Sequence, residues 1–418
     1  MAVFFYNVFL LLFNAGIRLA SLFDTKAGKW VAGRRDIFAR LRLAINGKGP
    51  VIWVHCASLG EFEQGRPLIE RLKIDYPSYK ILLTFFSPSG YEVQKDYKQA
   101  DWVFYLPMDG PRNAKEFLEI VQPSLVIFVK YEFWYYYLKK LKYRDIPLLL
   151  VSALFREDMS FFKWYGALQR KMLSRFDHLF VQNAESKVLV DRIGLSNICT
   201  VSGDTRFDRV TKIADGFTPI PAIEQFIAGS RTLIAGSTWK EDEVTLQKSF
   251  SSIADSNLKL IIAPHEIDSG HTAELKKLFP QSVLYSELAA EKSTSANCLI
   301  IDNFGMLSRL YYYGHINFVG GGFRKSGVHN VLEAAVYGKP VLYGPEYVKY
   351  TEAVELVRTG GGICVKDDEE TAGTISKLLN DEQAYRAISL KSKEYVRGNT
   401  GATEKIVRYI QEKRLLTI

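Results

Sequence analysis

The residues of this 418-residue chain that are best suited to chemistry lie in Ile316–Glu346, INFVGGGFRKSGVHNVLEAAVYGKPVLYGPE. Three glycines, with Gly321 in the middle, separate an apolar run from a stretch with helical spacing. Glycines in such a turn let backbone N–H groups approach an anion, and a helix N-terminus behind them adds partial positive charge. Asn330 and Glu333 are one helical turn apart, so both can face one ligand, and a carboxylate suits a ribose diol. The alternative is that the glycines only permit tight packing.

A candidate catalytic base, Glu61, lies in His55–Glu61 (HCASLGE), directly after the apolar run Val51–Val54. Ser58 can cap the helix that begins there, and Gly60 keeps the backbone open. At the carboxyl end of a strand, the Glu61 carboxylate could reach a cleft between two domains. The alternative is a capping box, whose signature is S-x-x-E. A serine hydrolase fits poorly because no G-x-S-x-G motif surrounds Ser58.

Two more strand-end turns follow in the first half of the chain. The turn with Ser87, in TFFSPSG, could line an acceptor site or be a plain turn. In the next, KYEFW, Lys130 and Glu132 could bind an anionic sugar or pair with each other.

Three strand-end turns in the second half carry groups that can hold a phosphate. They are Ala235–Glu243 (AGSTWKEDE), Ala263–Glu266 (APHE) and Asp302–Leu307 (DNFGML). Ser237 and Thr238 offer hydroxyls, and His265 could contact a base or a phosphate. Because the carboxyl ends of parallel strands meet at one edge of a sheet, these turns and the glycine turn together indicate a nucleotide site. The chain has no GxxxxGK[ST] loop and no clean G-x-G-x-x-G, which disfavours an ATPase or a dehydrogenase.

A regular alternation of apolar strands and helical segments must position these turns. We expect strands at Val51–His55, Ile81–Phe85, Trp102–Leu106, Leu125–Val129, Leu148–Val151, Leu179–Gln182, Thr232–Ala235, Leu258–Ala263, Cys298–Asp302, Ile316–Val319, Pro340–Tyr343 and Ile363–Val365. Continuous apolar strands between helices are typical of parallel sheets covered on both faces. The pattern predicts an α/β protein with two doubly wound, Rossmann-like domains facing a central cleft.

The domain boundaries follow from a break in this rhythm. Residues 215–229, DGFTPIPAIEQFIAG, contain two prolines and two glycines. We therefore expect a first domain at 25–215, a linker at 216–229, a second domain at 230–400 and a closing helix in 401–418. A helix is also expected at about 329–337, behind the glycine turn.

The N-terminus is apolar and is followed by a basic segment. Val3–Phe23 is mostly aromatic and aliphatic, and about long enough to span a bilayer. The basic residues after it are Lys26, Lys29, Arg34, Arg35, Arg40, Arg42 and Lys48, opposed only by Asp24 and Asp36. This pattern predicts a membrane anchor at residues 1–24 with the next domain in the cytoplasm, either crossing the bilayer or lying on its surface. The alternative is a buried N-terminal helix.

The amino-acid composition restricts the class of protein and the kinds of partner and metal site to expect. With 47% hydrophobic and 24% charged residues, the chain is that of a globular protein. Its net charge of +8 comes without a zinc finger, an RNP motif or a long basic arm, so we expect no nucleic-acid partner. The four cysteines (Cys56, Cys199, Cys298 and Cys364) lack CxxC spacing, which predicts buried free thiols and no metal site.

In their order along the chain, HCASLGE, TFFSPSG, KYEFW, GDTRFD, AGSTWKEDE, APHE and VGGG…GVHNVLEAAVYGKPVLYGP resemble the 3-deoxy-D-manno-octulosonic acid (Kdo) transferases. These glycosyltransferases of GT-B architecture place Kdo on lipid A precursors. The resemblance implies that Glu61 deprotonates the acceptor hydroxyl, that CMP-Kdo is the donor, and that no metal or other cofactor is needed. It implies a lipid A precursor (lipid IVA) as acceptor, at the cytoplasmic face of the inner membrane, in lipopolysaccharide core biosynthesis.

Carried over by motif, the CMP contacts fall on Pro264, His265, Phe304, Gly305, Met306, Asn330, Val331, Leu332 and Glu333, with Ser237, Thr238 and Gly321 beside them. Ser58, Gly60, Ser87, Lys130 and Glu132 are expected on the acceptor side. The number of Kdo residues added, the acylation and phosphorylation of the acceptor, and the oligomeric state stay open.

The chain departs from the usual family pattern at several positions. His265 stands where the family usually has arginine, Met306 where it has glutamate, and Val328 where it has a second glycine. Lys130 replaces a carboxylate, and Tyr135–Tyr136 replaces Pro–Asn. These changes leave the reaction type intact and bear on donor contacts and acceptor preference. The alternatives are another GT-B transferase using a UDP-sugar or a different CMP-linked acidic sugar, or a membrane-bound scaffold, which the presence of Glu61 disfavours.

Overall fold

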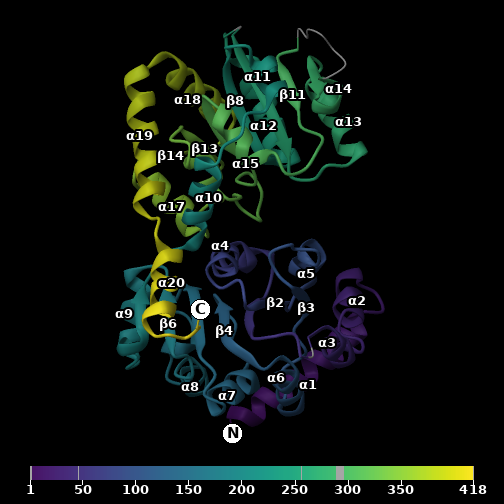
Figure 1. Cartoon of the computed structure of the whole chain (residues 1–418). Helices are drawn as coiled ribbons and strands as arrows, with labels where there is room; N and C mark the ends of the chain where they lie inside the picture. Colours follow the sequence, from purple (N-terminus) through teal and green to yellow (C-terminus); the bar gives the residue numbers. More distant parts are fainter. Residues whose placement is uncertain (1, 46, 256, 289–295, 418) are drawn as a thin grey trace. The chain divides into compact units, whose positions relative to one another are not determined.

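The computed structural model describes residues 2–45, 47–255, 257–288 and 296–417, which form two α/β units (Figure 1). The first unit contains Met1–Asp208 and Gly401–Ile418, and the second contains Arg209–Thr400. Each is built on a parallel sheet in which seven strands are described. The predicted α/β class with two doubly wound domains is confirmed.

The first sheet has the order β3-β2-β1-β4-β5-β6-β7. Its strands are β1 Val51–Cys56, β2 Lys80–Phe85, β3 Trp102–Tyr105, β4 Pro123–Val129, β5 Leu148–Ala153, β6 His178–Val181 and β7 Cys199–Val201. All six residues of β1 are buried, because helices cover both faces of the sheet. Alternate residues point to opposite faces: Trp53 packs in one core with Phe117, and Val54 in the other with Phe62 and Ile406.

The helices of this unit follow the strands in alternation. They are α4 Leu59–Asp75, α5 Pro88–Gln94, α6 Pro111–Val121, α7 Tyr135–Tyr143, α8 Ala167–Leu173, α9 Ala184–Arg192 and α20 Ala402–Glu412, while α10 Thr205–Asp215 contains the boundary between the units. The predicted closing helix is thus α20, the yellow helix drawn in the same unit as β6 in Figure 1.

The second sheet has the order β10-β11-β9-β8-β12-β13-β14. Its strands are β8 Arg231–Thr238, β9 Leu258–Pro264, β10 Ser282–Leu284, β11 Cys298–Ile300, β12 Ile316–Val319, β13 Val341–Tyr343 and β14 Gly362–Cys364. The helices are α11 Pro221–Ile227, α12 Lys240–Ser252, α13 Ser269–Leu278, α14 Tyr285–Leu288, α15 Leu307–Leu310, α16 Leu332–Ala335, α17 Thr351–Arg358, α18 Asp368–Asn380 and α19 Glu382–Gly398.

Every strand predicted from the sequence is present, and two short strands, β7 and β10, were missed. Two predictions need correction. The stretch predicted as a linker, 216–229, belongs to the second unit and forms α11, because Ile223 and Phe226 are buried there. The helix predicted at 329–337 is only α16, Leu332–Ala335, so it adds little of the partial charge of a long helix.

The four cysteines are free thiols: Cys56, Cys199 and Cys298 are buried as predicted, whereas Cys364 is half-buried.

Helix α1 (Ala2–Ala20) packs along the first unit through one stripe of side chains. The Tyr6 hydroxyl donates to Asp109 Oδ2 (2.7 Å), and the Phe13 ring meets the rings of Trp30 (5.8 Å) and Phe86 (5.9 Å). Of the described residues of α1, only Leu10 is buried, so the alternative of a buried N-terminal helix is wrong. Its other side exposes Phe4, Phe5, Val8, Phe9, Leu11, Leu12 and Leu19.

Candidate active site

Glu61 lies in the first turn of α4, at the carboxyl end of β1. The Ser58 hydroxyl donates to the Glu61 carboxylate and makes no side-chain bond to the backbone of the helix. The capping box is therefore not formed, and the serine instead holds the carboxylate of Glu61. Glu61 is half-buried and Gly60 is exposed, so the carboxylate remains accessible. The Glu61 carboxylate can therefore take a proton from an acceptor hydroxyl that comes within hydrogen-bond distance of it.

Glu132 lies in a buried polar network that joins three of the predicted motifs. Its Oε2 accepts from Trp134 Nε1 (2.6 Å) and lies 2.7 Å from Nε2 of the buried His55. The other ring nitrogen of His55, Nδ1, lies 2.8 Å from Thr84 Oγ1, which also accepts from Trp53 Nε1 (2.8 Å). Glu132 is only 8% exposed, so its carboxylate holds the His55 and Trp134 side chains and is not an open contact for the acceptor sugar.

Ser87 and Lys130 are placed by backbone geometry beside this network. Ser87 caps α5, accepting from the Ser89 N–H (3.3 Å), and its own N–H donates to Ala57 O (2.7 Å). The TFFSPSG segment thus forms a turn that Ser87 caps, and a contact of Ser87 with the acceptor stays a prediction. Lys130 follows β4 with a left-handed φ of 67°, uncommon outside glycine and often found at functional sites. Its ammonium lies 5.4 Å from the centre of the Tyr131 ring.

The GDTRFD motif meets the helix that carries Glu61. Gln64 Nε2 donates to Asp204 Oδ2 (3.1 Å), and Arg206 binds the same oxygen through Nη2 (2.7 Å). Although burial opposes ionisation, the Arg206 guanidinium and backbone N–H hold the pKa of Asp204 below its ordinary value. An ionised carboxylate thus anchors α4 from a loop 140 residues away.

In the second unit, a buried carboxylate that the sequence did not reveal engages the glycine turn. Asp242 Oδ2 accepts from the N–H groups of Gly321 (2.7 Å) and Trp239 (2.9 Å), and Gly320 N donates to Gly236 O (2.9 Å). These N–H groups are therefore not available to an external anion. A Cβ on Gly320 would lie 2.4 Å from Ser237 O, so close packing explains this glycine. Burial raises the pKa of Asp242 to about 6, against its backbone hydrogen bonds.

Four side chains form a stack at this edge of the second sheet. The His265 ring stacks on both Trp239 (4.7 Å between centroids) and His329 (4.3 Å), whose own centroids are 6.3 Å apart, and the Arg324 guanidinium lies 3.9 Å from the centre of the Trp239 ring. Trp239 Nε1 donates to His329 Nε2 (2.9 Å), so that nitrogen carries no proton. We call these residues the ring stack.

The charge of the ring stack resides on Arg324. Burial lowers the pKa of His329 to about 4, with His265 and Arg324 adding to the effect, and burial also lowers the pKa of His265. Both rings are therefore neutral near pH 7. Within the described part of the chain, the Arg324 guanidinium has no salt bridge or hydrogen-bond partner. No pattern in the sequence indicated His329, Trp239 or Arg324, because stacking between residues up to 90 positions apart leaves no local signal.

The other predicted donor residues divide into accessible and buried groups. Asn330 Nδ2 donates to Glu333 Oε1 (3.0 Å), as their spacing predicted, and burial raises the pKa of Glu333 while Asn330 and Arg209 oppose the rise. Thr238 faces inward, donating to Glu243 Oε1 (2.9 Å), whereas Ser237 is half-buried with a φ of 53°. The exposed residues are His265, Phe304 and Gly305, and the buried ones are Pro264, Met306, Val331 and Leu332.

Within the described residues, no group of three or more His, Cys, Asp or Glu side chains is arranged to hold a metal ion. That the reaction needs no metal stays a prediction.

Comparison with known proteins decides the family. Residues 34–209, which contain Glu61 and Glu132, match the family model described as 3-deoxy-D-manno-octulosonic-acid transferase (kdotransferase). The chain is 31% identical to the 3-deoxy-D-manno-octulosonic acid transferase of Aquifex aeolicus, over 84% of this chain and 91% of that protein. The chain belongs to this family. It is also 26% identical to the enzyme of the same name from Chlamydia pneumoniae, over 92% and 90% of the two chains.

The resemblance that the motifs indicated is thus confirmed: this Kdo transferase is a glycosyltransferase of lipopolysaccharide biosynthesis. Among solved structures, the UDP-GlcNAc 2-epimerase of Neisseria meningitidis has the same fold, with a TM-score of 0.59. It is 17% identical, and the match covers 87% of this chain and 100% of that chain. This likeness supports the GT-B-like architecture and nothing about the reaction.

Proposed function

We propose that this transferase moves Kdo from CMP-Kdo to a hydroxyl of a lipid A precursor, lipid IVA, with Glu61 as the base. The observation that carries the proposal is the accessible Glu61 carboxylate, held by Ser58 at the carboxyl end of β1. Glu61 takes the proton of the acceptor hydroxyl, and the oxygen forms a bond to the anomeric carbon of Kdo. The bond from that carbon to the phosphate oxygen breaks, and CMP leaves with the electron pair.

The ring stack is the part of the second unit that we propose for the donor. CMP-Kdo carries a phosphate and a carboxylate, and Arg324 is a permanent cation beside two neutral imidazoles and an indole face. These rings can stack with a base or accept contacts from a sugar, while the guanidinium binds an anionic oxygen. His265 is among the residues that the family resemblance assigns to CMP. The contacts of Phe304 to Met306 and of Asn330 to Glu333 stay predictions.

Membrane association is proposed through α1. By length and composition, Ala2–Ala20 is apolar enough to cross a membrane. Because Tyr6 and Phe13 dock onto the first unit, we propose that α1 lies in the interface with its exposed apolar side in the lipid. Of the basic segment, Lys26, Lys29 and Arg35 are exposed and suit the anionic cytoplasmic face of the inner membrane. Arg42 instead pairs with Glu116 (2.6 Å).

The test is transfer by the purified protein from CMP-Kdo to a tetraacylated lipid A precursor, followed by CMP release and lipid mass. We expect the wild type to add Kdo and Glu61→Gln to lose about 10²- to 10⁴-fold in rate. Glu63→Gln, with the same charge change on the same helix, is the matched control and should keep its rate. The mass increments also count the Kdo residues added.

Three outcomes would contradict parts of the proposal. A fully active Glu61→Gln variant would show that Glu61 is not the catalytic base. CMP binding without transfer would indicate another acceptor or another CMP-linked acidic sugar. Absence of both CMP binding and transfer would refute CMP-Kdo as donor.

A further inference from the structure

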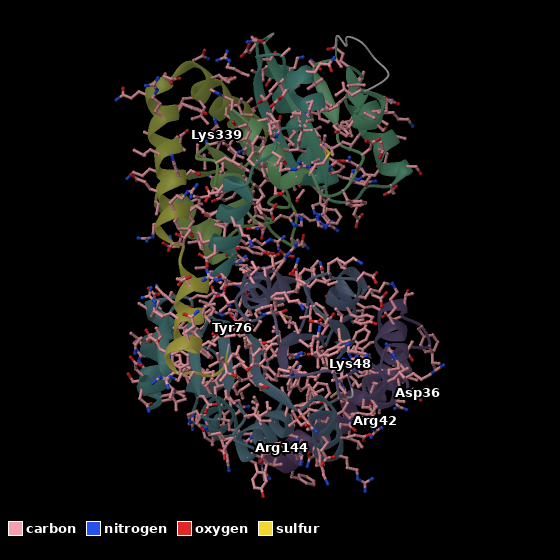
Figure 2. All side chains as sticks on the ribbon, viewed as in Figure 1. Asp36, Arg42, Lys48, Tyr76, Arg144 and Lys339 are labelled. Atoms are coloured by element: carbon pink, nitrogen blue, oxygen red, sulfur yellow. The ribbon has the colours of Figure 1, made fainter. Side chains whose placement is uncertain are left out.

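A cavity of about 610 Å³ lies beside α1 in the first unit, in a region that no catalytic step uses. Its walls are α1, the segment that joins α2 (Thr25–Ala32) to α3 (Ile37–Ile45), and the loop after β3. Its polar lining includes Asn14, Arg18, Arg34, Arg35, Asp36 and Asn113. We call it the arginine cavity; Figure 2 labels Asp36 at this part of the unit.

The arginine cavity is built on a half-buried cation, Arg34. Arg34 donates to Leu106 O through Nε (2.9 Å) and to Phe86 O through Nη2 (2.8 Å), and its guanidinium lies 3.7 Å from the centre of the Trp30 ring. These partners are neutral, and burial lowers the pKa of Arg34 to about 9. Among the described residues, no carboxylate contacts Arg34, so its positive charge is not neutralised by a direct ion pair.

Other hydrogen-bond donors in the lining have weak acceptors or none among the described residues. Trp30 is only 5% exposed, and its buried Nε1 has no hydrogen-bond acceptor among the described residues. Arg35 has no salt bridge or side-chain hydrogen bond to a described residue, and Arg18 makes only a long contact to Asn14 (3.4 Å). Three arginines face a single acidic residue, Asp36, in this lining. Such a surplus of donors and positive charge suits an anion with several acceptor oxygens, above all a phosphate.

The position of the cavity relates it to Glu61. Arg34 contacts the carbonyls directly after β2 and β3, so the cavity lies at the carboxyl edge of the sheet. Glu61 follows β1 at the same edge, and the order is β3-β2-β1. Neighbouring strands are about 4.8 Å apart, which places the ends of β3 and β1 roughly 10 Å from each other. A phosphorylated sugar headgroup can cover that distance.

The arginine cavity borders the exposed apolar side of α1. Leu11 and Leu19 of that helix are exposed on either side of Asn14 and Arg18, which line the cavity. Acyl chains can therefore lie along α1 while a headgroup phosphate enters the cavity. A free phosphate would use the arginines without using this apolar surface.

We propose that the arginine cavity is the subsite that binds a phosphate of the acceptor headgroup. Arg18 and Arg35 contact the phosphate oxygens, and Arg34 with the buried Trp30 forms the floor of the cavity. The proposal rests on the proposed function, because it assumes a phosphorylated lipid whose sugar hydroxyl reaches Glu61.

The test compares the double variant Arg18→Gln/Arg35→Gln with the wild type in nonionic detergent micelles. The acceptors are the tetraacylated disaccharide with two phosphates and the same lipid with none. We expect the KM for the bisphosphorylated acceptor to rise about 10- to 100-fold. The kcat, the KM for CMP-Kdo and the KM for the unphosphorylated acceptor should stay unchanged.

The matched control is Arg42→Gln/Lys48→Gln, which also removes two positive charges, both from the basic segment that contains Arg35. Arg42 and Lys48, both labelled in Figure 2, line a different cavity. This control should keep the wild-type KM for both acceptors. A rise as large as that of the Arg18/Arg35 variant would show a general charge effect and overturn the proposal.

Two further measurements separate the sources of phosphate and the two hypotheses. If Arg18→Gln/Arg35→Gln weakens binding to phosphatidylglycerol vesicles but leaves the acceptor KM unchanged, the cavity binds bulk lipid and the proposal is wrong. If the wild type shows no transfer, equilibrium binding of the bisphosphorylated lipid in micelles still tests the cavity. Equal binding by wild type and variant would then refute the subsite independently of the reaction.

Discussion

Asp242 offers the sharpest test of how the second unit is held together. The buried Asp242 carboxylate accepts two short hydrogen bonds on one oxygen, Oδ2, from the N–H groups of Gly321 and Trp239. Its other oxygen, Oδ1, has only a long contact to the N–H of Phe323 (3.4 Å). Asparagine can place its single carbonyl oxygen at Oδ2 and keep both short bonds, whereas alanine keeps neither.

The magnitudes follow from the pKa of Asp242 and its hydrogen bonds. Burial raises that pKa from 3.8 to about 6. The folded protein therefore binds more protons than the unfolded chain between about pH 4 and 6, and the free energy of unfolding falls as the pH rises through this window. At about 1.4 kcal/mol for each pH unit, the loss is about 3 kcal/mol. Two buried N–H groups without acceptors cost about 2–6 kcal/mol.

We therefore expect Asp242→Asn to be near neutral at pH 4 and up to about 3 kcal/mol more stable than the wild type at pH 7.5. Asp242→Ala should be less stable than Asp242→Asn by about 2–6 kcal/mol at either pH. Both variants should lack the part of the pH dependence between pH 4 and 6 that Asp242 contributes.

Trp239 reports this unfolding locally, because it is the only tryptophan in residues 209–400. Urea unfolding of protein labelled with 5-fluorotryptophan, followed by the ¹⁹F resonance of Trp239, measures the second unit alone. Equal destabilisation by Asn and Ala at both pH values would refute the geometry of the two bonds. A pH dependence between pH 4 and 6 that is as large in Asp242→Asn as in the wild type would refute the raised pKa of Asp242.

Two further predictions concern the end of the chain and the glycine turn. Asp208 accepts from the N–H groups of Gly401 (2.5 Å) and Thr403 (2.7 Å) at the start of α20, so Asp208→Ala should destabilise that helix by about 1–2 kcal/mol. Faster hydrogen exchange of these two amides, with Asp208→Asn intermediate, would show it, and unchanged protection would contradict it. Gly320→Ala should lower the urea midpoint of the second unit, because its Cβ would meet the Ser237 carbonyl at 2.4 Å. Its control, Gly373→Ala in α18, meets no atom within 4 Å and should raise stability by up to about 1 kcal/mol.

The strands were predictable because their signal is local. Each predicted strand is an apolar run bounded by turn residues, and both faces of the sheets are covered by helices. The two missed strands, Cys199–Val201 and Ser282–Leu284, have only three residues each and lie at sheet edges. Short strands with a serine or a threonine carry too little apolar pattern to be distinguished from loops.

The candidate site was predictable only in part. Glu61 could be found because a carboxylate follows an apolar strand and a serine at a fixed spacing. The buried role of Glu132 could not, because its partner His55 is 77 positions away. The same holds for the ring stack, whose members come from three separate turns.

By itself, the sequence determined the strands, the positions of the turns and, through the resemblance of its motifs, the family. These features depend on residues that are close in sequence, so the local pattern of apolar and turn residues is enough to predict them. Only the tertiary structure decided which polar groups are hydrogen-bonded within the protein and which are available to a ligand. The glycine turn shows the difference: the sequence supplied the N–H groups, but a carboxylate 79 positions away accepts the bond from Gly321. A hydrogen bond forms with whatever acceptor the fold brings within about 3 Å, and no local pattern records that distance.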